Sequence, residues 1–397
     1  MEPSQAKPKI LFAVDPALSI TGGVSVLAQV LIREFSKTHE VYLLSHDTPD
    51  FIANHEVGKH LAGHLRWEPP AQGPPHMCYL NYTKRLAEQI ADLDIRLVHF
   101  HSGFFNWGNR FFGFSLPRQL RKRGVPSIWT THGVFSLLRG YCGPKQPLIV
   151  KLALFPSAWL GKLDQVQNTA CEIQVSKCDL QTIKRVWFPL KRKCIQIYHS
   201  KMEDVLPDDT TIKRENYILN VGYVSFNKRQ DLIVKAFIQI ADRHPDWKLY
   251  LIGHDSGDGC QQLIEKMISD SKLGERIKLM GSRNDAGSFM QSCGIYVHSS
   301  DYEGLPLAPQ EAMYYGCSAI ASDIAPHCEL FESSGCGILF KQGDAAALAK
   351  HMEFLLTDPQ ARKRLGLAAR KFVFEQGMTK TAMIEKHASL YQKFARK

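Results

Sequence analysis

Residues 299–312 read SSDYEGLPLAPQEA, a polar loop that follows a short apolar strand at 294–297 and leads into a helix. Pro309 fits the first turn of that helix, whose unpaired backbone N–H groups form an anion site suited to a phosphate. Glu303 and Glu311 are eight positions apart, and carboxylates accept hydrogen bonds from sugar hydroxyls. Taken alone, the pair is better explained as a loop cap and a residue that complements the helix dipole. The stretch predicts strand, loop and helix, the repeating unit of an α/β fold.

Short apolar strands alternate with segments of helical period along the whole chain. We expect strands at 10–14, 40–44, 97–100, 127–131, 172–175, 194–198, 217–221, 248–252, 276–280, 294–297 and 318–321. Amphipathic helices are expected between them, among others at 230–241, 260–271, 345–356 and 359–374. This alternation predicts parallel sheets that are covered by helices on both faces.

A break in the rhythm at residues 204–213, DVLPDDTTIK, divides the chain. We therefore expect an α/β protein of two facing, doubly wound Rossmann-like domains, at residues 1–205 and 206–377. A helix at about 378–397 is expected to pack back on the first domain. Ligands of such folds bind at the carboxyl ends of the strands, here in an interdomain cleft. A closed eight-stranded barrel is the structural alternative, and the uneven strand spacing disfavours it.

The composition is that of an ordinary globular protein. The 397 residues are 44% hydrophobic and 22% charged, which excludes a disordered or collagen-like chain. The ten cysteines include no C-x-x-C pair, so we expect reduced thiols and a cytoplasmic protein. No apolar run approaches about 18 residues, so neither a signal peptide nor a membrane-spanning helix is expected.

The net charge of +10 comes from residues 101–200, which hold 15 Lys and Arg against 3 Asp and Glu. Such a patch attracts an anionic surface, and a solvated basic face explains it equally well. Within it, residues 102–110 and 134–160 are candidates for acceptor binding. The second stretch resembles an interfacial helix on an anionic leaflet, and a core helix with snorkelling lysines is at least as good an explanation. Pro144, Pro147 and Pro156 are expected to shorten any helix there.

Several motifs occur together along the chain. They are TGGV at 21–24, THG at 131–133, Gly222 with Lys228, GSR at 281–283, EGLPLAPQEAMYYGCSAIASDIA at 303–325, and 329–344 ending in GILFKQGD. On these motifs the chain resembles the retaining glycosyltransferases of the group 1 type, glycosyltransferase family 4. The resemblance covers nearly the whole chain and implies the two-domain GT-B fold. It also implies a metal-independent enzyme without a cofactor, which transfers a hexose from a UDP- or GDP-linked sugar.

The resemblance implies a role for each matching residue. Lys228 would bind the diphosphate and Glu303 the hydroxyls of the donor sugar. Glu311 would hold the ribose, and His132 would lie near the sugar. The catalytic residues implied are Glu303, His132 and Lys228, and the donor-binding residues are Gly22, Gly23, Gly222, Arg229, Arg283, Gly304, Leu305, Pro306, Leu307 and Glu311. No metal site is expected, because Asp92-Leu93-Asp94 is better explained as a helix end.

Two positions depart from the family pattern. Tyr223 stands where the family usually has an arginine, so one cation of the diphosphate site is missing. Arg229 or Arg283 could substitute for it. His199-Ser200-Lys201 replaces an Asn-Gly-Val-Asp-like turn at the hinge between the domains. A fixed ammonium and a helix N-terminus would still stabilise the charge that a departing diphosphate gains.

The expected protein is a cytoplasmic glycosyltransferase of polysaccharide biosynthesis, peripheral on the inner face of the membrane if the basic quarter binds lipid. Its acceptor would be a glycan, a lipid-linked sugar or a small molecule. One alternative is a catalytically weak subunit that binds nucleotide sugars, which Tyr223 supports. Another is an epimerase or disaccharide phosphorylase on the same scaffold. No nucleic-acid partner is expected, since the chain contains no motif for one.

Overall fold

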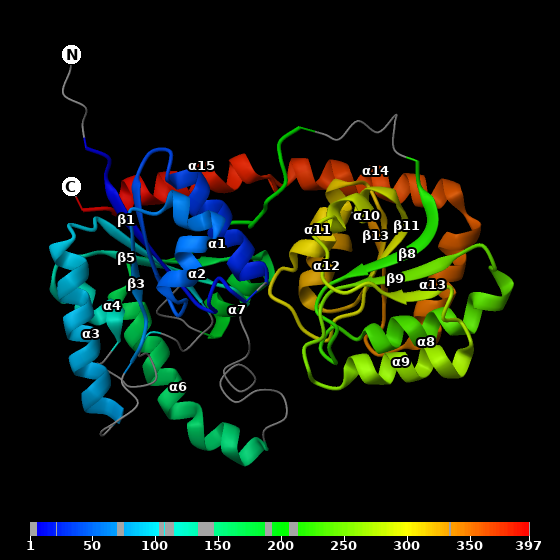
Figure 1. The fold of residues 1–397 in the computed structure, drawn as a ribbon, viewed down its shortest axis with the longest axis horizontal. Coiled ribbons are helices and arrows are strands. Elements are labelled where there is room, and N and C mark those ends of the chain that lie inside the picture. Colours follow the sequence, from blue (N-terminus) through cyan, green and yellow to red (C-terminus); the bar gives the residue numbers. More distant parts are fainter. Residues whose placement is uncertain are drawn as a thin grey trace. The chain divides into compact units, whose positions relative to one another are not determined.

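The computed structural model describes residues 6–20, 22–69, 75–102, 107, 115–133, 147–186, 193–205, 213–332 and 335–396. The chain divides into two compact units (Figure 1). Unit 1 comprises residues 1–201 and 382–397, and unit 2 comprises residues 202–381. The sequence predicts these boundaries near 205 and 378. Each unit is described by itself below.

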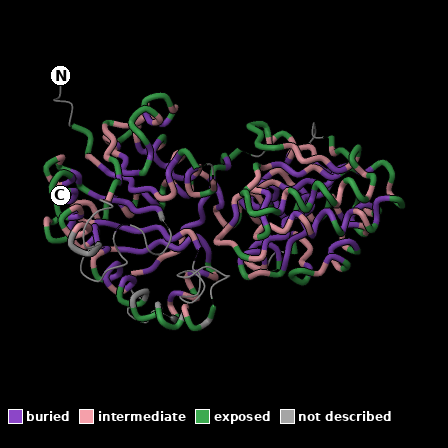
Figure 2. Tube along the Cα trace, turned by 60° about the horizontal axis from the view of Figure 1, so that its bottom comes forward, coloured by how far each residue is buried: buried purple, intermediate pink, exposed green. Residues whose placement is uncertain are grey.

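Unit 1 is built on a seven-stranded parallel sheet with the order β3-β2-β1-β4-β5-β6-β7. Its strands are β1 (Lys9–Val14), β2 (Glu40–Ser45), β3 (Gly63–Arg66), β4 (Leu97–Ser102), β5 (Ser127–Thr131), β6 (Cys171–Gln174) and β7 (Cys194–Gln196). The helices are α1 (Gly23–Phe35), α2 (Pro49–Asn54), α3 (Pro75–Asp92), α4 (Leu116–Lys122), α6 (Leu148–Asn168) and α7 (Lys177–Val186), with a 3-10 turn η1 (Glu56–His60). The central strands are buried on both faces (Figure 2), as in a sheet covered by helices on both sides.

Unit 2 repeats this architecture with the order β10-β9-β8-β11-β12-β13, again all parallel. Its strands are β8 (Glu215–Val221), β9 (Lys248–Ile252), β10 (Ile277–Leu279), β11 (Cys293–His298), β12 (Ser318–Ser322) and β13 (Gly337–Phe340). The helices are α8 (Gln230–Ile240), α9 (Cys260–Ser271), α10 (Ala286–Ser292), α11 (Leu307–Tyr314), α12 (Ala325–Phe331), α13 (Ala345–Thr357) and α14 (Pro359–Glu375), with η3 (Ala241–Arg243). These two open sheets replace the closed barrel that was the structural alternative.

In both units the strand order reverses beside the first strand, between β1 and β4 and between β8 and β11. Open parallel sheets bind their ligands at the carboxyl ends of the strands beside such a reversal. The loops that follow β1 and β4 in unit 1, and β8 and β11 in unit 2, are therefore the places where the fold positions a site.

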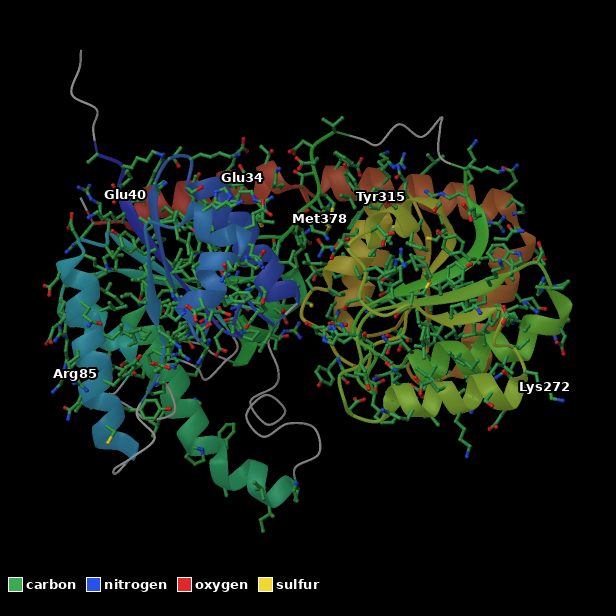
Figure 3. All side chains as sticks on the ribbon, viewed as in Figure 1. Glu34, Glu40, Arg85, Lys272, Tyr315 and Met378 are labelled. Carbon is green, nitrogen blue, oxygen red and sulfur yellow. The ribbon has the colours of Figure 1, made fainter. Side chains whose placement is uncertain are left out.

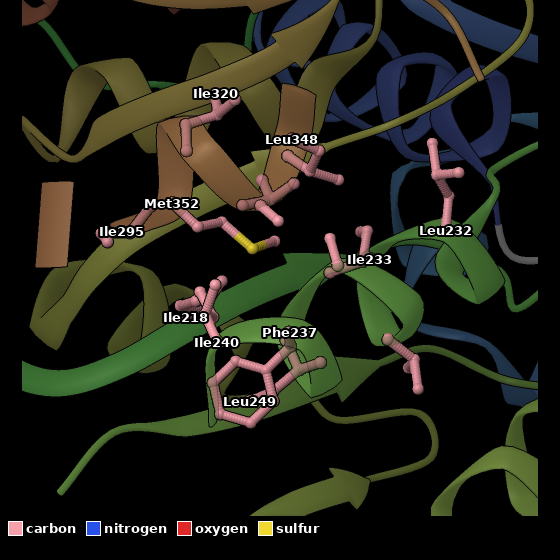
Figure 4. Close-up of a cluster of buried hydrophobic side chains, with 14 of the residues drawn as sticks. Ile218, Leu232, Ile233, Phe237, Ile240, Leu249, Ile295, Ile320, Leu348 and Met352 are labelled. Carbon is pink, nitrogen blue, oxygen red and sulfur yellow. The ribbon is translucent and has the colours of Figure 1, made fainter. Parts of the chain in front are cut away.

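The core of unit 2 lies between one face of its sheet and helices α8, α9 and α13. Apolar side chains from these elements interlock there, as Figure 4 shows for ten labelled residues. Phe237 and Ile240 recur on one face of α8 because they are three positions apart. Leu348 and Met352 do the same on α13. This packing fixes α8 and hence the loop that precedes it.

The last helix, α15 (Lys380–Phe394), belongs to unit 1 from Ala382 onward. Tyr391 is 3% exposed and packs against Phe35 of α1, with ring centroids 4.5 Å apart. Its hydroxyl lies 2.7 Å from Nδ1 of His99 on β4. The C-terminal segment thus completes the core of unit 1.

The structure corrects three expectations. Strands β3 and β13 were missed, because each is a four-residue edge strand and β3, GHLR, has one strongly apolar residue. Helix α6 runs unbroken from 148 to 168, with Pro147 at its N-cap and Pro156 inside it. Pro156 is tolerated because it lies on an exposed face, where water can bond the carbonyl that its ring leaves unpaired.

Helix α6 has two halves of different character. Ile149 and Leu152 in its first half are 76% and 56% exposed. In its second half Lys162 is fully buried and its Nζ lies 2.6 Å from Oε1 of Glu172 on β6.

No helix among the described residues has the length and apolarity needed to cross a bilayer.

Candidate active site

The carboxyl ends of β8, β9 and β10 meet in a layer of three glycines. Gly222, Gly253 and Gly281 each have positive φ, at 157°, 154° and 62°. A side chain at Gly253 would place its Cβ 1.9 Å from the carbonyl oxygen of Gly222, so glycine is required there. A Cβ at Gly222 would come within 3.9 Å of the Lys228 side chain. The predicted residue Gly222 therefore lies against Lys228, and Gly253 was missed by the sequence analysis.

Lys228 and Glu303 form an ion pair between the loops that follow β8 and β11, 75 residues apart in sequence. The side chains are 18% and 12% exposed. Ser300 donates a hydrogen bond of 2.7 Å to the same carboxylate oxygen, Oε1. Burial by itself would raise the pKa of Glu303, but the Lys228 ammonium and the hydrogen bond with His298 outweigh it and hold that pKa well below its usual range.

His298, the last residue of β11, is a further member of this cluster. Its Nε2 lies 3.1 Å from Oε1 of Glu303, and its Nδ1 lies 3.1 Å from the hydroxyl of Tyr296. Burial lowers the pKa of His298 despite the neighbouring carboxylate, so the ring is neutral near pH 7. A neutral ring that donates from Nε2 to Glu303 must accept from Tyr296 at Nδ1. His298 and Ser300 were not predicted, although both lie within five positions of Glu303.

The helix N-terminus expected after the loop is present. Helix α11 begins at Leu307 with Pro306 as its N-cap, which puts Pro309 in the first turn. Gly304, Leu305 and Leu307 are half-buried and Glu311 is buried. Backbone N–H groups of a first helical turn have no partner within the helix and suit an anion. The segment from Gly304 to Leu307 therefore adjoins the Lys228–Glu303 pair, as the motif implies.

The turn after α11 is fixed by two arginines. Tyr315, labelled in Figure 3, offers its carbonyl oxygen to Nη2 of Arg214 at 2.5 Å and to Nη2 of Arg370 at 3.0 Å. Gly316 follows with φ of 69°, and its α-carbon faces the Arg370 guanidinium. These contacts hold the C-terminal end of α11 and so help to keep its N-terminus in place.

The two predicted substitutes for the missing arginine are engaged elsewhere. Arg229 pairs with Asp231 at 3.1 Å and with Asp301 at 3.6 Å. Arg283 pairs with Asp285 at 2.7 Å, and its guanidinium lies over the Phe289 ring. Aspartates therefore compensate both positive charges in this structure.

Tyr223, at the position where the family usually has arginine, packs edge-on against His254 with ring centroids 4.2 Å apart. Its hydroxyl oxygen is buried and has no hydrogen-bond partner among the described residues. Burial raises the pKa of the phenol, so the group stays neutral. Position 223 thus offers a neutral hydroxyl, where the family resemblance implies a cation.

Unit 1 holds the remaining predicted residues. Gly22 is the N-cap of α1 and Gly23 its first residue, while Thr21 of the motif lies outside the described residues. The preceding loop is held by Asp47, whose carboxylate accepts from the N–H groups of Leu18 at 2.8 Å and Ser19 at 2.9 Å. Burial would raise the pKa of Asp47, and these bonds lower it overall. Asp47 was not predicted.

His132 directly follows β5 and is half-buried. Its Nε2 lies 3.2 Å from Nδ1 of His101 on β4. The predicted site residues therefore form two groups, one at the carboxyl end of each sheet. Of the expected acceptor loops, only Ser102, Trp107 and residues 147–160 are described. In the described ranges no group of three or more His, Cys, Asp or Glu side chains is arranged so that it could hold a metal ion.

Comparisons with known proteins identify the family. The family model of the "Glycosyl transferases group 1" matches residues 203–372, and that of "Glycosyltransferase Family 4" matches residues 21–187. An uncharacterized glycosyltransferase of Haemophilus influenzae is 27% identical over 44% of this chain and 50% of its own length. The putative glycosyltransferase EpsD of Bacillus subtilis is 24% identical over 70% of this chain and 72% of its own.

Solved structures show the same fold. HepE of Anabaena, solved in complex with UDP, superimposes with a TM-score of 0.76 at 14% identity and covers 97% of this chain and 100% of its own. Sucrose-phosphate synthase of Thermosynechococcus elongatus has a TM-score of 0.74 at 19% identity, with 98% and 99% covered. The two family models lie one on each parallel sheet and between them span most of the chain. The chain therefore belongs to the group 1 glycosyltransferases and has their GT-B fold.

Proposed function

We propose that this protein is a metal-independent, retaining hexosyltransferase that uses a UDP- or GDP-linked sugar. The observation that carries the proposal is the Lys228–Glu303 pair, placed where the strand order of unit 2 reverses and beside the N-terminus of α11. A cation and a helix N-terminus suit a diphosphate, and a carboxylate with a depressed pKa suits sugar hydroxyls.

The pair can serve both ends of a donor at once. A lysine ammonium has three N–H donors, so Lys228 can keep Glu303 and still donate to phosphate oxygens. Glu303 uses Oε1 for Lys228, Ser300 and His298. A carboxylate can accept several hydrogen bonds in all, which leaves capacity for hydroxyls of the sugar.

In the proposed reaction the bond between the anomeric carbon and the phosphate oxygen breaks. An acceptor hydroxyl forms the new bond on the same face of the sugar, and its proton passes to the departing phosphate. The diphosphate gains charge in this step, and Lys228 with the amides at the start of α11 would stabilise it. Tyr223 could add a neutral hydrogen bond where the family has a charged one.

Named relatives support this donor and acceptor class. HepE was solved with UDP and also with UDP-glucose. The N-acetyl-alpha-D-glucosaminyl L-malate synthase of Bacillus anthracis is 24% identical over 77% of this chain and 76% of its own length. A lipopolysaccharide core mannosyltransferase of Rhizobium leguminosarum is 28% identical over 35% of this chain and 40% of its own. We therefore propose a glycan, a lipid-linked sugar or a small molecule as acceptor.

A nucleotide-release assay tests the proposal. Purified protein is incubated with UDP-glucose, UDP-N-acetylglucosamine or GDP-mannose and an acceptor extract, with and without EDTA. We expect release of one nucleoside diphosphate, no loss of rate with EDTA, and an α-configured product by NMR. Release that stops with EDTA, or an inverted product, would contradict the metal-independent retaining mechanism.

Tyr223 favours a second candidate, a subunit that binds nucleotide sugars without transferring them. With one cation replaced by a neutral hydroxyl, a diphosphate could still bind while its departure is poorly stabilised. This candidate predicts nucleotide binding in calorimetry together with no nucleotide release for any donor and acceptor. The same two measurements therefore separate it from the transferase.

We also propose that the first half of α6 touches an anionic membrane, which would place the protein on the cytoplasmic inner face. Ile149, Leu152, Phe155, Trp159 and Leu160 are large apolar side chains that are each more than one third exposed. This half of α6 reaches away from the sheet of unit 1 (Figure 1). Amphipathic helices of this kind bind lipid through apolar burial and attraction to anionic headgroups. Part of the basic charge is compensated within unit 1, however, because Arg118 pairs with Asp164 at 2.6 Å.

Co-sedimentation with vesicles tests this surface. We expect binding to phosphatidylglycerol vesicles and weaker binding to phosphatidylcholine vesicles, with both reduced in Ile149→Asn/Leu152→Asn. The matched control is Leu263→Asn/Phe354→Asn, two side chains of unit 2 that are 40% and 44% exposed. Equal binding by the two double variants would contradict the assignment to α6.

A further inference from the structure

Five histidines of unit 1 form one buried cluster that includes the proposed catalytic residue His132. His99, His101, His199 and His387 are all 2% exposed or less. The ring centroids of His101 and His132 are 5.5 Å apart, those of His99 and His101 4.0 Å, and those of His132 and His199 5.2 Å. The cluster joins the ends of β4, β5 and β7 to helix α15, and nothing in the proposed reaction uses its interior members.

Within this cluster a chain of short contacts runs from α15 to His132. The hydroxyl of Tyr391 lies 2.7 Å from Nδ1 of His99, and Nε2 of His99 lies 2.8 Å from Oγ1 of Thr130. Nε2 of His101 lies 3.3 Å from Nδ1 of His99. Nδ1 of His101 lies 3.2 Å from Nε2 of His132. Each nitrogen in the chain therefore faces a specific partner.

The rings are neutral, which makes the direction of each contact matter. Burial lowers the pKa of His99 and His101 well below the usual value, and neighbouring histidines lower it further. Burial together with His387 lowers the pKa of His132 to about 3. A neutral imidazole donates from one nitrogen and accepts at the other. Each contact in the chain thus fixes the proton position of the next ring.

One arrangement gives every contact a donor and an acceptor. Nδ1 of His99 has two partners, the Tyr391 hydroxyl and Nε2 of His101. The buried Tyr391 hydroxyl has no other hydrogen-bond partner among the described residues, so its proton is satisfied only if it is donated to an unprotonated Nδ1 of His99. Nε2 of His101 faces this same unprotonated nitrogen, so a hydrogen bond there needs a proton on His101. His101 then carries its proton on Nε2 and accepts at Nδ1. The contact with His132 is satisfied only if Nε2 of His132 carries the proton.

We infer that His101 is a positioning residue that holds His132 as the Nε2–H tautomer, so that Nδ1 of His132 presents a lone pair to a substrate hydroxyl. Nδ1 of His132 accordingly accepts a hydrogen bond from a hydroxyl group and does not donate one to a phosphate oxygen. The substrate group it selects is an alcohol of the sugar or of the acceptor. The hydrogen bond from a substrate hydroxyl to His132 rests on the proposed transferase activity, whereas the tautomer of His132 does not depend on it.

Nitrogen NMR of protein labelled at its histidines tests the tautomer directly. The signals of His132 are assigned by their loss in His132→Gln, and the shifts of the two ring nitrogens identify which one is protonated. We expect the Nε2–H form in the wild-type protein. An Nδ1–H form, or an even mixture of the two, would overturn the inference, and this measurement requires no variant of His101 to fold.

An isosteric pair of variants tests the role of His101. Asn at position 101 can place an oxygen near the position of Nδ1 and accept from His132, whereas Leu has the same shape without an acceptor. We expect the Nε2–H form to persist in His101→Asn and to be lost in His101→Leu. An unchanged tautomer in a folded His101→Leu would overturn the positioning role.

Binding measurements link the tautomer to function. In His101→Leu we expect the affinity for the sugar nucleotide or the acceptor to fall about fivefold, the worth of one neutral hydrogen bond. The affinity for the free nucleoside diphosphate should stay unchanged, and His101→Asn should restore the loss. A general loss of structure would reduce both affinities. If no nucleotide binds even to the wild type, the proposed function fails while the NMR result still decides the tautomer.

Discussion

Replacing Lys228 by methionine should lower both the stability of the protein and its affinity for a nucleoside diphosphate, and these two effects have separate causes. The methionine keeps most of the volume of the lysine stem but leaves the Glu303 carboxylate, 12% exposed, with Ser300 and His298 as its partners. Removing one member of a buried pair costs about 3–5 kcal/mol, and the two remaining hydrogen bonds reduce this to about 2–4 kcal/mol. The affinity for a nucleoside diphosphate should also fall, because a charge-assisted hydrogen bond worth about 1.5–3 kcal/mol is lost. That loss corresponds to about 10–100-fold in Kd.

The double variant Lys228→Met/Glu303→Gln distinguishes the two effects. Its free energy of unfolding in urea should recover most of the loss, since no buried charge remains unpaired. Its nucleotide affinity, measured by calorimetry, should stay low because the ammonium is still absent. Lys380 and Glu203, a lysine–glutamate pair of unit 2 with 23% and 63% exposed side chains, provide the control. Lys380→Met should cost no more than about 1 kcal/mol. Full recovery of nucleotide affinity in the double variant would refute the role given to Lys228.

Three further predictions follow from the same contacts. Tyr223→Arg should strengthen nucleoside diphosphate binding about tenfold or more in calorimetry by restoring a charged donor, and unchanged or weaker binding would show that position 223 does not face the diphosphate. Lys162→Met should lower the free energy of unfolding by about 3–5 kcal/mol, because it leaves the buried Glu172 carboxylate without its positively charged partner. The double variant with Glu172→Gln should recover most of that loss. Since the pKa of Glu303 is depressed, its contribution to stability is present above its ordinary pKa of about 4.3 and is lost as the pH falls. The free energy of unfolding in urea should therefore fall less on acidification in Glu303→Gln than in the wild type. Equal dependence of this free energy on pH in the two proteins would contradict the depressed pKa.

The sequence pattern predicted the fold because both sheets are parallel and buried. Strands such as ILFAV at 10–14 and YILNV at 217–221 are apolar enough to be recognised alone. Edge strands β3 and β13 gave weak signals, since each has four residues and a neighbour on one side only. Pro156 misled the prediction because proline disrupts a helix less on a face open to water.

The site was predictable where a motif is local and not where it depends on tertiary contacts. The loop and helix from Gly304 to Leu307 could be placed from the sequence, as one motif contains them all. The pairing of Lys228 with Glu303 depends on β8 lying beside β11, which no local signal reports. Arg229 and Arg283 are each followed two positions later by the aspartate that they bind, a signal present in the sequence and not used.

The histidine cluster could not be found in the same way. Its members come from β4, the ends of β5 and β7, and α15, and only His99 and His101 are close in sequence. Alternate positions on a strand share a face, so that pair was visible as a pattern. The contact of His99 with His387 could not be predicted in this way, because it depends on the last helix packing in unit 1.

Calorimetric titration of the wild-type protein with UDP, GDP and ADP, and then with their hexose conjugates, tests the central claim most directly. We expect micromolar binding of one nucleotide and of its sugar conjugate, with the nucleotide affinity reduced at least tenfold in Lys228→Met. Binding of none of these ligands, or binding that Lys228→Met leaves unchanged, would contradict the assignment of the nucleotide-sugar site to the loops after β8 and β11.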